Sequence, residues 1–199
     1  MSVWGDSDFG KKPKPLDEAR GGFLFTHWGL SGPAPLNVSR AMTANPGRRL
    51  ELECDFLPET PLHEYQERLR RRCREHGKRR SSGLLQELPA RLAESLLAQA
   101  GISLERNLAE LSNDELARVG SAVKRTRISL VGALGFEKAE VTAGGVSLGE
   151  IDSRTMASKL VPNLYFAGEI LDLDGRIGGY NFQSAFSTGW VAGTSLAAD

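Results

Sequence analysis

The sequence predicts an α+β fold, in which strands near both ends of the chain flank an inserted helical subdomain. The 22 glycines of the 199 residues fall 7 in residues 1–57, 4 in 58–127 and 11 in 128–199. The middle segment also has 14 Lys and Arg against 10 Asp and Glu, whereas the last has 4 against 8. We therefore divide the chain into a β-rich segment (1–57), a basic helical subdomain (58–127) and a returning β-containing segment (128–199).

In the first segment, apolar and acidic residues alternate from Leu50 to Phe56. This period of two predicts a strand with one buried face. Upstream, Phe23 to Phe25 predicts a short strand that enters a turn at Gly29 to Gly32. Pro33 then suits the start of a short helix that runs to about Thr43.

The middle segment has the start and stop signals of three amphipathic helices. Thr60 can cap the first helix, Pro61 suits its first position, and Gly77 ends it. A second helix is expected to start near Pro89, and a third at the capping box Ser112 to Glu115. Apolar residues three or four positions apart in each indicate a small bundle.

The last segment predicts strands at Ile128 to Val131 and Lys138 to Val141. Leu164 to Ala167 is apolar on both faces, which favours a buried strand, parallel and central in its sheet. Asn181 is a possible cap for a final helix. Such a helix would carry a stripe of small residues, Ala185, Gly189 and Gly193. Because interior glycines lower helix propensity, we expect the helix to be stable only when something packs tightly against this stripe.

Composition excludes several classes of protein. The 25 basic and 25 acidic residues cancel, which removes the global case for a nucleic-acid or anionic-membrane binder. No apolar run is long enough to span a bilayer, and the first residues do not resemble a signal peptide, so we expect a cytoplasmic protein. The two cysteines form no CxxC, and no metal site is expected.

One stretch has the pattern of a ligand site. Gly168-Glu169 ends the expected buried strand, and a glycine-rich turn then leads into a helix N-terminus. Backbone N–H groups and the positive end of the helix dipole favour an anionic or electron-rich ligand such as a dinucleotide or a flavin. A purely structural connection has the same pattern and stays the alternative.

The same stretch resembles the aminoacetone-oxidase-like family of bacterial FAD flavoproteins, whose members are usually named NAD(P)/FAD-dependent oxidoreductases. Five ordered segments carry the resemblance: Gly22 to Pro33 (GFLFTHWGLSGP), Ala139 to Val146 (AEVTAGGV), Thr155 to Leu160 (TMASKL), Asn163 to Glu169 (NLYFAGE) and Gly178 to Asn181 (GGYN). The similarity is good over about 21–40 and 128–196 and loose over the helical middle.

The resemblance implies an FAD domain interrupted by a β-barrel that carries a helical subdomain, with the end of the chain returning to the FAD domain. The sequence contains no Gly-x-Gly-x-x-Gly fingerprint. The chain therefore looks like the C-terminal portion of such a protein, without the N-terminal βαβ unit. FAD is expected for the full-length family but is not expected to be retained by this chain alone, because the usual pyrophosphate anchor is missing.

Residue by residue, the resemblance implies a set of cofactor contacts. Gly168 and Glu169 match the strand end beside the ribityl and pyrophosphate portion of FAD. The loop and helix start near the flavin ring are matched by Gly178, Gly179, Tyr180 and Asn181. Asp172 and Asp174 could bind ribityl hydroxyls or be ordinary turn residues. The turn at the re-entry into the FAD domain, which could equally be a plain tight turn, is matched by Thr142, Gly144 and Gly145.

The leading functional hypothesis is therefore a portion of an FAD-dependent oxidoreductase that supplies the flavin-ring side of the site. Its catalytic residues, its substrate and any use of NAD(P)H are not identified by the sequence. An incomplete barrel would leave an open sheet edge, so a homodimer or an N-terminal FAD-domain chain is an expected partner. A non-catalytic interaction module without cofactor is the alternative.

A third hypothesis is nucleic-acid binding through the run Arg68 to Arg80. This run holds eight basic residues against one acid, Glu75. The charges encircle a helix with an intact apolar stripe, which is typical of a solvated face. The sequence alone therefore does not favour a nucleic-acid partner.

Overall fold

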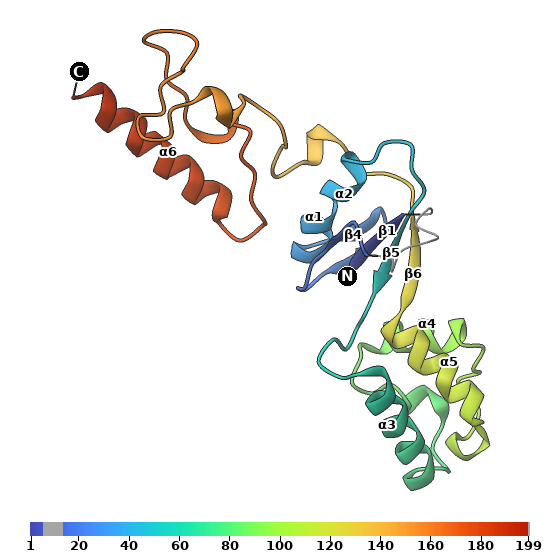
Figure 1. The fold of residues 1–199 in the computed structure, drawn as a ribbon. Helices are drawn as coiled ribbons and strands as arrows, with labels where there is room; N and C mark the ends of the chain where they lie inside the picture. Colours follow the sequence, from blue (N-terminus) through green and yellow to red (C-terminus); the bar gives the residue numbers. More distant parts are fainter. Residues whose placement is uncertain (6–13, 199) are drawn as a thin grey trace. The chain divides into compact units, whose positions relative to one another are not determined.

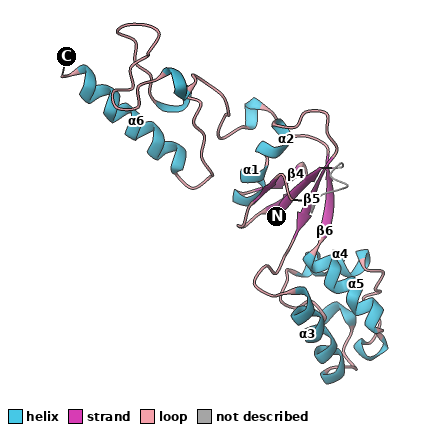
Figure 2. Cartoon of the chain, viewed as in Figure 1, coloured by secondary structure: helices cyan, strands magenta, loops and turns pink. Residues whose placement is uncertain are grey.

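The computed structural model describes residues 1–5 and 14–198 and confirms the α+β class (Figures 1 and 2). The chain forms two compact units. Unit 1 contains Met1–Pro15 and Arg49–Leu130, and unit 2 contains Leu16–Arg48 and Val131–Asp199. The division at residues 57 and 127, made from composition, is a different partition of the chain and stays a prediction.

Unit 1 contains an antiparallel sheet in the order β1 (Ser2–Gly5), β5 (Leu50–Cys54) and β6 (Thr126–Leu130). The register pairs Leu52 with Val3 on one side and with Ile128 on the other. The alternation in β5 buries Leu50, Leu52 and Cys54, as the sequence predicts. Among the described strands none pairs with the outer edge of β6, so the sheet is open rather than a closed barrel.

Three helices form the rest of unit 1: α3 (Leu62–Glu75), α4 (Ala90–Gln99) and α5 (Asn113–Lys124). The 3-10 turns η1 (Ser81–Gly83) and η2 (Leu108–Glu110) connect them. The fully buried centre of this bundle comes from the three helices, η2 and the loop after η1: Tyr65, Leu69, Leu84, Leu85, Leu97, Leu108, Val119 and Val123. The three expected amphipathic helices are therefore confirmed.

The helix starts follow local chemistry. Ser112 caps α5 by accepting from the Glu115 amide, and the Glu115 carboxylate accepts from the Ser112 amide, so the expected capping box is confirmed. The expected Thr60 cap of α3 is wrong. Pro61 occupies the N-cap position and no side chain caps the helix, because the extended backbone at Pro61 places the helix start one residue later.

Unit 2 begins with β2 (Asp17–Glu18) and the hairpin of β3 (Leu24–Thr26) with β4 (Gly29–Ser31). The expected strand near Phe25 is confirmed. The expected turn at Gly29 to Gly32 is wrong, because the chain reverses at His27 and Trp28, where the Thr26 hydroxyl donates to the Gly29 carbonyl. The expected helix forms as two short pieces, α1 (Pro33–Val38) and α2 (Arg40–Thr43).

The remainder of unit 2 is mostly loop. It contains η3 (Phe136–Lys138), η4 (Leu148–Glu150), η5 (Gly168–Ile170) and the helix α6 (Tyr180–Leu196). The expected strands at Lys138 to Val141 and Leu164 to Ala167 are both wrong. A central parallel strand needs partners on both edges, and in the described chain Tyr165 makes only one isolated antiparallel bridge, to Ala157. Leu164 is consequently exposed.

A small core of Ile151, Met156, Leu171 and Ala192 holds α6 against the preceding loops. The opposite face of α6 is exposed and aromatic: Phe182, Phe186 and Trp190 are each about three-quarters accessible to solvent. A side chain added at Gly189 or Gly193 would meet no described atom within 4 Å. Among the described residues, therefore, nothing packs tightly against the Gly189 and Gly193 part of the expected stripe, whereas Ala185 is half-buried beside Gly168. None of the described helices is long and apolar enough to cross a membrane.

Replacing Leu69 with Ala tests whether the helical bundle is a cooperative core. Leu69 is completely buried, so the truncation is expected to lower the free energy of unfolding by about 2 to 5 kcal/mol. Chemical denaturation followed by far-UV circular dichroism measures the change. His63→Ala, on the exposed side of the same helix, is the control and is expected to have little effect.

The capping box predicts a specific acid response. Hydrogen bonds from Arg106 and from the Ser112 backbone and hydroxyl lower the pKa of Glu115 from 4.5 to about 2. A lowered pKa in the folded state stabilises the fold above pH 4.5, and this contribution disappears as the pH falls to about 2. Glu115→Gln should therefore flatten the dependence of unfolding on pH in that window. Glu94→Gln, which removes an exposed glutamate of α4, should leave the dependence unchanged.

Candidate functional site

Two segments predicted as separate parts of the site lie side by side in unit 2. The amide of Val146 donates to the Ile170 carbonyl (2.8 Å), and the amide of Asp172 donates to the Val146 carbonyl (2.9 Å). A Cβ on Gly145, whose φ is +148°, would lie 2.4 Å from the Ile170 carbonyl oxygen. Only glycine allows this approach, so Gly145 has a defined structural role.

Glu169 and Thr142 make a second link between the same two segments. The Glu169 carboxylate accepts from the Thr142 amide at 2.9 Å and from its hydroxyl at 3.2 Å. Gly168 has a φ of +80°, and its amide donates to the hydroxyl of Thr188 on α6 at 2.9 Å. Gly144, with a φ of +99°, precedes the close approach at Gly145. The two segments and α6 thus form one cluster.

The glycine-rich turn before α6 is fixed by Asn181. Its side chain accepts from the Gly175 amide (2.7 Å) and donates to the Gly175 carbonyl (3.0 Å). Asn181 is therefore a turn-closing residue and the expectation that it caps α6 is wrong. Gly179, with a φ of +91°, is the N-cap. The chain enters the helix from a left-handed conformation, which glycine adopts without strain. Because glycine has no side chain, this position cannot cap the helix with a side-chain hydrogen bond.

The aspartates of the site differ in their availability. Asp174 is engaged in an ion pair with Arg40 of α2 at 2.8 Å. Asp172 is exposed, and the structure shows no side-chain partner for it among the described residues. The Asn37 side chain accepts from the Ile177 amide at 2.7 Å and holds the same turn. Asp172 is thus available to bind a ligand hydroxyl, whereas Asp174 would first have to release Arg40.

The start of α6 offers an uncapped set of donors. The first backbone bond of the helix joins the Gln183 amide to the Gly179 carbonyl, and no side chain caps the N-terminus. The amides of Tyr180, Asn181 and Phe182 therefore point out of the helix end without an intrahelical acceptor. Gly178 and Tyr180 beside them are exposed. This end of the helix can stabilise negative charge or accept a polar ligand edge.

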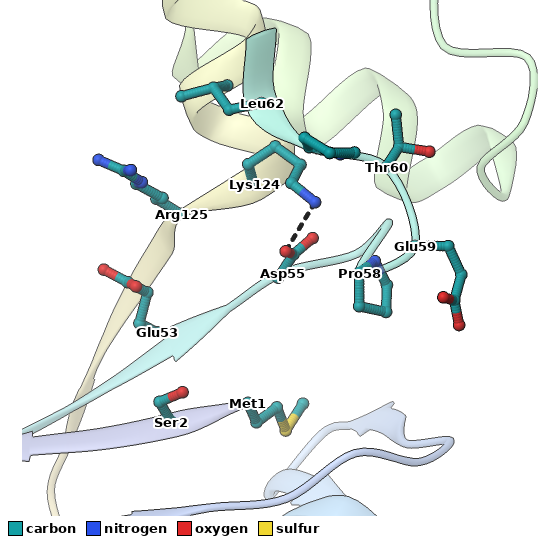
Figure 3. A pocket seen from close by; sticks show the side chains of 11 residues that line it. Met1, Ser2, Glu53, Asp55, Pro58, Glu59, Thr60, Leu62, Lys124 and Arg125 are labelled. Atoms are coloured by element: carbon teal, nitrogen blue, oxygen red, sulfur yellow. Dashed lines mark ion pairs between the residues drawn. The ribbon is translucent and has the colours of Figure 1, made fainter. Parts of the chain in front are cut away.

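A cavity of about 410 Å³ in unit 1 is lined by residues of that unit alone (Figure 3). It lies where β5 ends and α5 meets β6. Lys124, only 7% exposed, forms an ion pair with Asp55 (2.7 Å) and donates to the Leu57 carbonyl (2.6 Å). The sequence analysis missed this pair, because a lysine in the last turn of a helix is usually a surface residue. Lys124 is fully engaged and joins a strand end to a helix.

The thiols offer no reactive group. Burial raises the pKa of Cys54 to about 11, and burial also raises the pKa of Cys73. Both side chains are therefore protonated at neutral pH and poor nucleophiles. Within residues 1–5 and 14–198, no group of three His, Cys, Asp or Glu side chains could hold a metal ion.

Gly145→Ala is expected to separate the two halves of the cluster. The added methyl would occupy the position of the Ile170 carbonyl, so the amides of Val146 and Asp172 should lose their protection from hydrogen exchange. Exchange measured by mass spectrometry or NMR reports on both amides. Gly149→Ala is the control, because its added carbon would lie 3.5 Å from the nearest side-chain atom. Unchanged protection in Gly145→Ala would contradict the close approach.

Two family profiles match overlapping parts of the chain. A family profile described as "HI0933-like protein barrel and H2TH domain" matches residues 9–141, and one described as "HI0933-like protein Rossmann domain" matches residues 91–195. Residues 91–195, which contain the candidate site and most of α6, show no parallel sheet in the structure.

Three curated relatives match nearly the whole chain. A ribosomal RNA dihydrouridine synthase of Escherichia coli is 37% identical over 90% of this chain and 43% of its own length. The Haemophilus influenzae protein of the same name is 34% identical over 87% of this chain and 42% of its own length. A 3-dehydro-bile acid delta(4,6)-reductase of Clostridium scindens is 31% identical over 92% of this chain and 45% of its own length.

The chain therefore spans less than half the length of these relatives. None of the three bears the aminoacetone-oxidase name that the sequence resemblance suggested, whereas the broader resemblance to flavin-dependent oxidoreductases is supported. With two profiles that each match more than half of the residues, the chain belongs to the HI0933-like family.

Proposed function

We propose that this chain forms part of an FAD-dependent oxidoreductase and supplies the loops that face the flavin. The observation that carries the proposal is the pairing of residues 142–146 with residues 169–172, in one cluster with α6, a helix whose own start is uncapped. Family membership supports it, because two relatives are named as a synthase of dihydrouridine and one as a reductase.

The donor set fits the polar parts of a flavin cofactor. Amides at the start of α6 can stabilise negative charge on a reduced flavin, and exposed Gly178 and Gly179 allow the cofactor to approach the backbone. Bound FAD would supply the electron transfer. The chain's own residues would bind and orient the cofactor: Asn181 fixes the turn, Glu169 fixes Thr142, and the exposed Asp172 carboxylate can accept a hydrogen bond from a ribityl hydroxyl.

The proposed reaction is the reduction of an electron-poor carbon–carbon double bond. A dihydrouridine is a uridine that has gained two hydrogens at its pyrimidine double bond, and a reductase also delivers electrons to its substrate. Both kinds of relative thus carry names that describe reductions. An activity of the aminoacetone-oxidase type is the alternative within the same class, and a comparison of substrates with the complete protein distinguishes them.

We further propose that the exposed aromatic face of α6 packs against the rest of a flavin domain. Phe182, Phe186 and Trp190 lie four residues apart on one side of the helix, and large exposed apolar surfaces mark interaction sites. The open edge of β6 is a second candidate contact, through which a homodimer could form. A non-catalytic binding module remains the alternative if neither surface recruits a cofactor domain.

The chain alone is expected to lose FAD. A few hydrogen bonds of roughly 0.5 to 1.5 kcal/mol each do not offset an association cost of about 4 to 15 kcal/mol without the pyrophosphate anchor. The purified chain is mixed with excess FAD, separated from unbound cofactor and examined by visible absorption. Retention of near one equivalent would contradict this expectation.

A chimaera tests the flavin-facing role. This chain replaces the matching segment of the Escherichia coli relative, and the flavin content of the purified protein is measured. We expect the chimaera to hold near one equivalent, and Asn181→Ala to reduce it by opening the turn at Gly175. Gln183→Ala, on the exposed surface of the same helix, is the control. A folded chimaera without flavin, or equal flavin content in both variants, would contradict the role.

A further inference from the structure

The basic residues between Arg68 and Arg80 fall into two groups in the structure. One group is occupied within the protein: Arg68 and Arg72 both pair with Glu87, at 3.4 and 2.9 Å. Arg70 pairs with Glu67 of the same helix, and Arg80 pairs with Glu105 and donates to its carbonyl. Arg68, Arg72 and Arg80 help to hold α3 and its loop to the bundle, and the four arginines are not available as a set to a partner.

The other group consists of Arg71, Arg74, Lys78 and Arg79, which we name the cationic patch. All four side chains are exposed, and none has an ion pair or hydrogen-bond partner among the described residues. They lie in the second half of α3 and the loop that follows it. Exposed Glu75 offsets one charge, so this stretch of surface keeps a net charge of +3. The structure thus separates four unpaired cations from a run that the sequence pattern alone assigns to a solvated face.

The loop that carries Lys78 and Arg79 has a fixed backbone. The Gly77 carbonyl accepts from the Ala109 amide at 3.0 Å, and the Arg79 carbonyl accepts from the Leu108 amide at 2.9 Å. A Cβ on Gly77 would lie 2.9 Å from the Cβ of Ala109, so the loop after α3 and the η2 turn are in close contact. Cations on a fixed backbone lose less conformational freedom when they bind a partner.

We propose that the cationic patch binds the phosphodiester backbone of an RNA substrate. Three of its four cations are arginines, whose planar guanidinium groups match phosphate oxygens in pairs. The relatives of Escherichia coli and Haemophilus influenzae act on ribosomal RNA according to their names, and the alignments cover most of this chain. That the bound RNA is the substrate rests on the proposed function; the binding itself does not.

The test measures binding of a fluorescein-labelled RNA hairpin with a uridine-rich loop to the full chain, without flavin, over a range of salt concentrations. The test variant changes Arg71, Arg74, Lys78 and Arg79 to Gln. The matched control makes the same number of changes at four other exposed basic residues without a side-chain partner: Arg49, Arg91, Arg125 and Lys138. Circular dichroism checks that both variants fold, since Arg74 also lies at the favourable end of the α3 dipole.

We expect the patch variant to bind at least tenfold more weakly at low salt. Its slope of log affinity against log salt should fall by about 3, since each lost phosphate contact on a single strand contributes roughly 0.7. The control variant should keep most of its affinity for RNA and most of its salt dependence. Absence of salt-dependent binding by the unaltered chain, equal losses in the two variants, or equal competition by polyglutamate would each overturn the proposal; the last would indicate an acidic protein partner.

Failure here and failure of the proposed function are distinguishable. If the patch does not bind RNA while the chimaera holds flavin, the oxidoreductase stands with a substrate of another class. If RNA binds through the patch while the chimaera lacks flavin, the interaction surface stands without the redox role.

Discussion

The close approach of Gly145 to the backbone of residues 170–172 is the contact on which the candidate site depends. It lets Val146 bond to both Ile170 and Asp172, and so brings Thr142 within reach of Glu169. Any residue with a Cβ at position 145 would collide with the Ile170 carbonyl oxygen, so only glycine fits there. The arrangement of the loops that we propose to face the flavin is thus set by a steric constraint on one residue, and not by a hydrophobic core, which is small in this part of the chain.

Unit 1 is held together differently. Its helices share a core of fully buried aliphatic side chains and Tyr65, and the pair of Lys124 with Asp55 joins the end of α5 to the strand β5. Ion pairs to Glu87 fix the inner arginines of α3 and leave the outer cations without partners. The same packing that stabilises the bundle therefore also presents a charged surface on a fixed backbone.

Features encoded over a few residues were predictable from the sequence. The alternation in β5 and the capping box at Ser112 and Glu115 both formed as expected. Leu164 to Ala167 did not form the expected strand, because strand formation depends on partners that local sequence does not contain. The glycine-rich stretch from Gly168 to Asn181 was identified from its own pattern, and the turn at Thr142 to Gly145 through resemblance. The Thr142–Glu169 bonds and the Arg40–Asp174 pair join residues far apart in the sequence and required the structure.

The most direct test of the central claim is an amide NMR titration of the isotope-labelled chain with a large excess of FAD. Weak binding at the proposed surface should shift the amides of residues 142–146 and 168–182, with the start of α6 changing most, since its uncapped donors are proposed to contact the cofactor. Amides around the Lys124 cavity should remain unchanged. Shifts centred on that cavity, or none along 168–182 at saturating cofactor, would contradict the account.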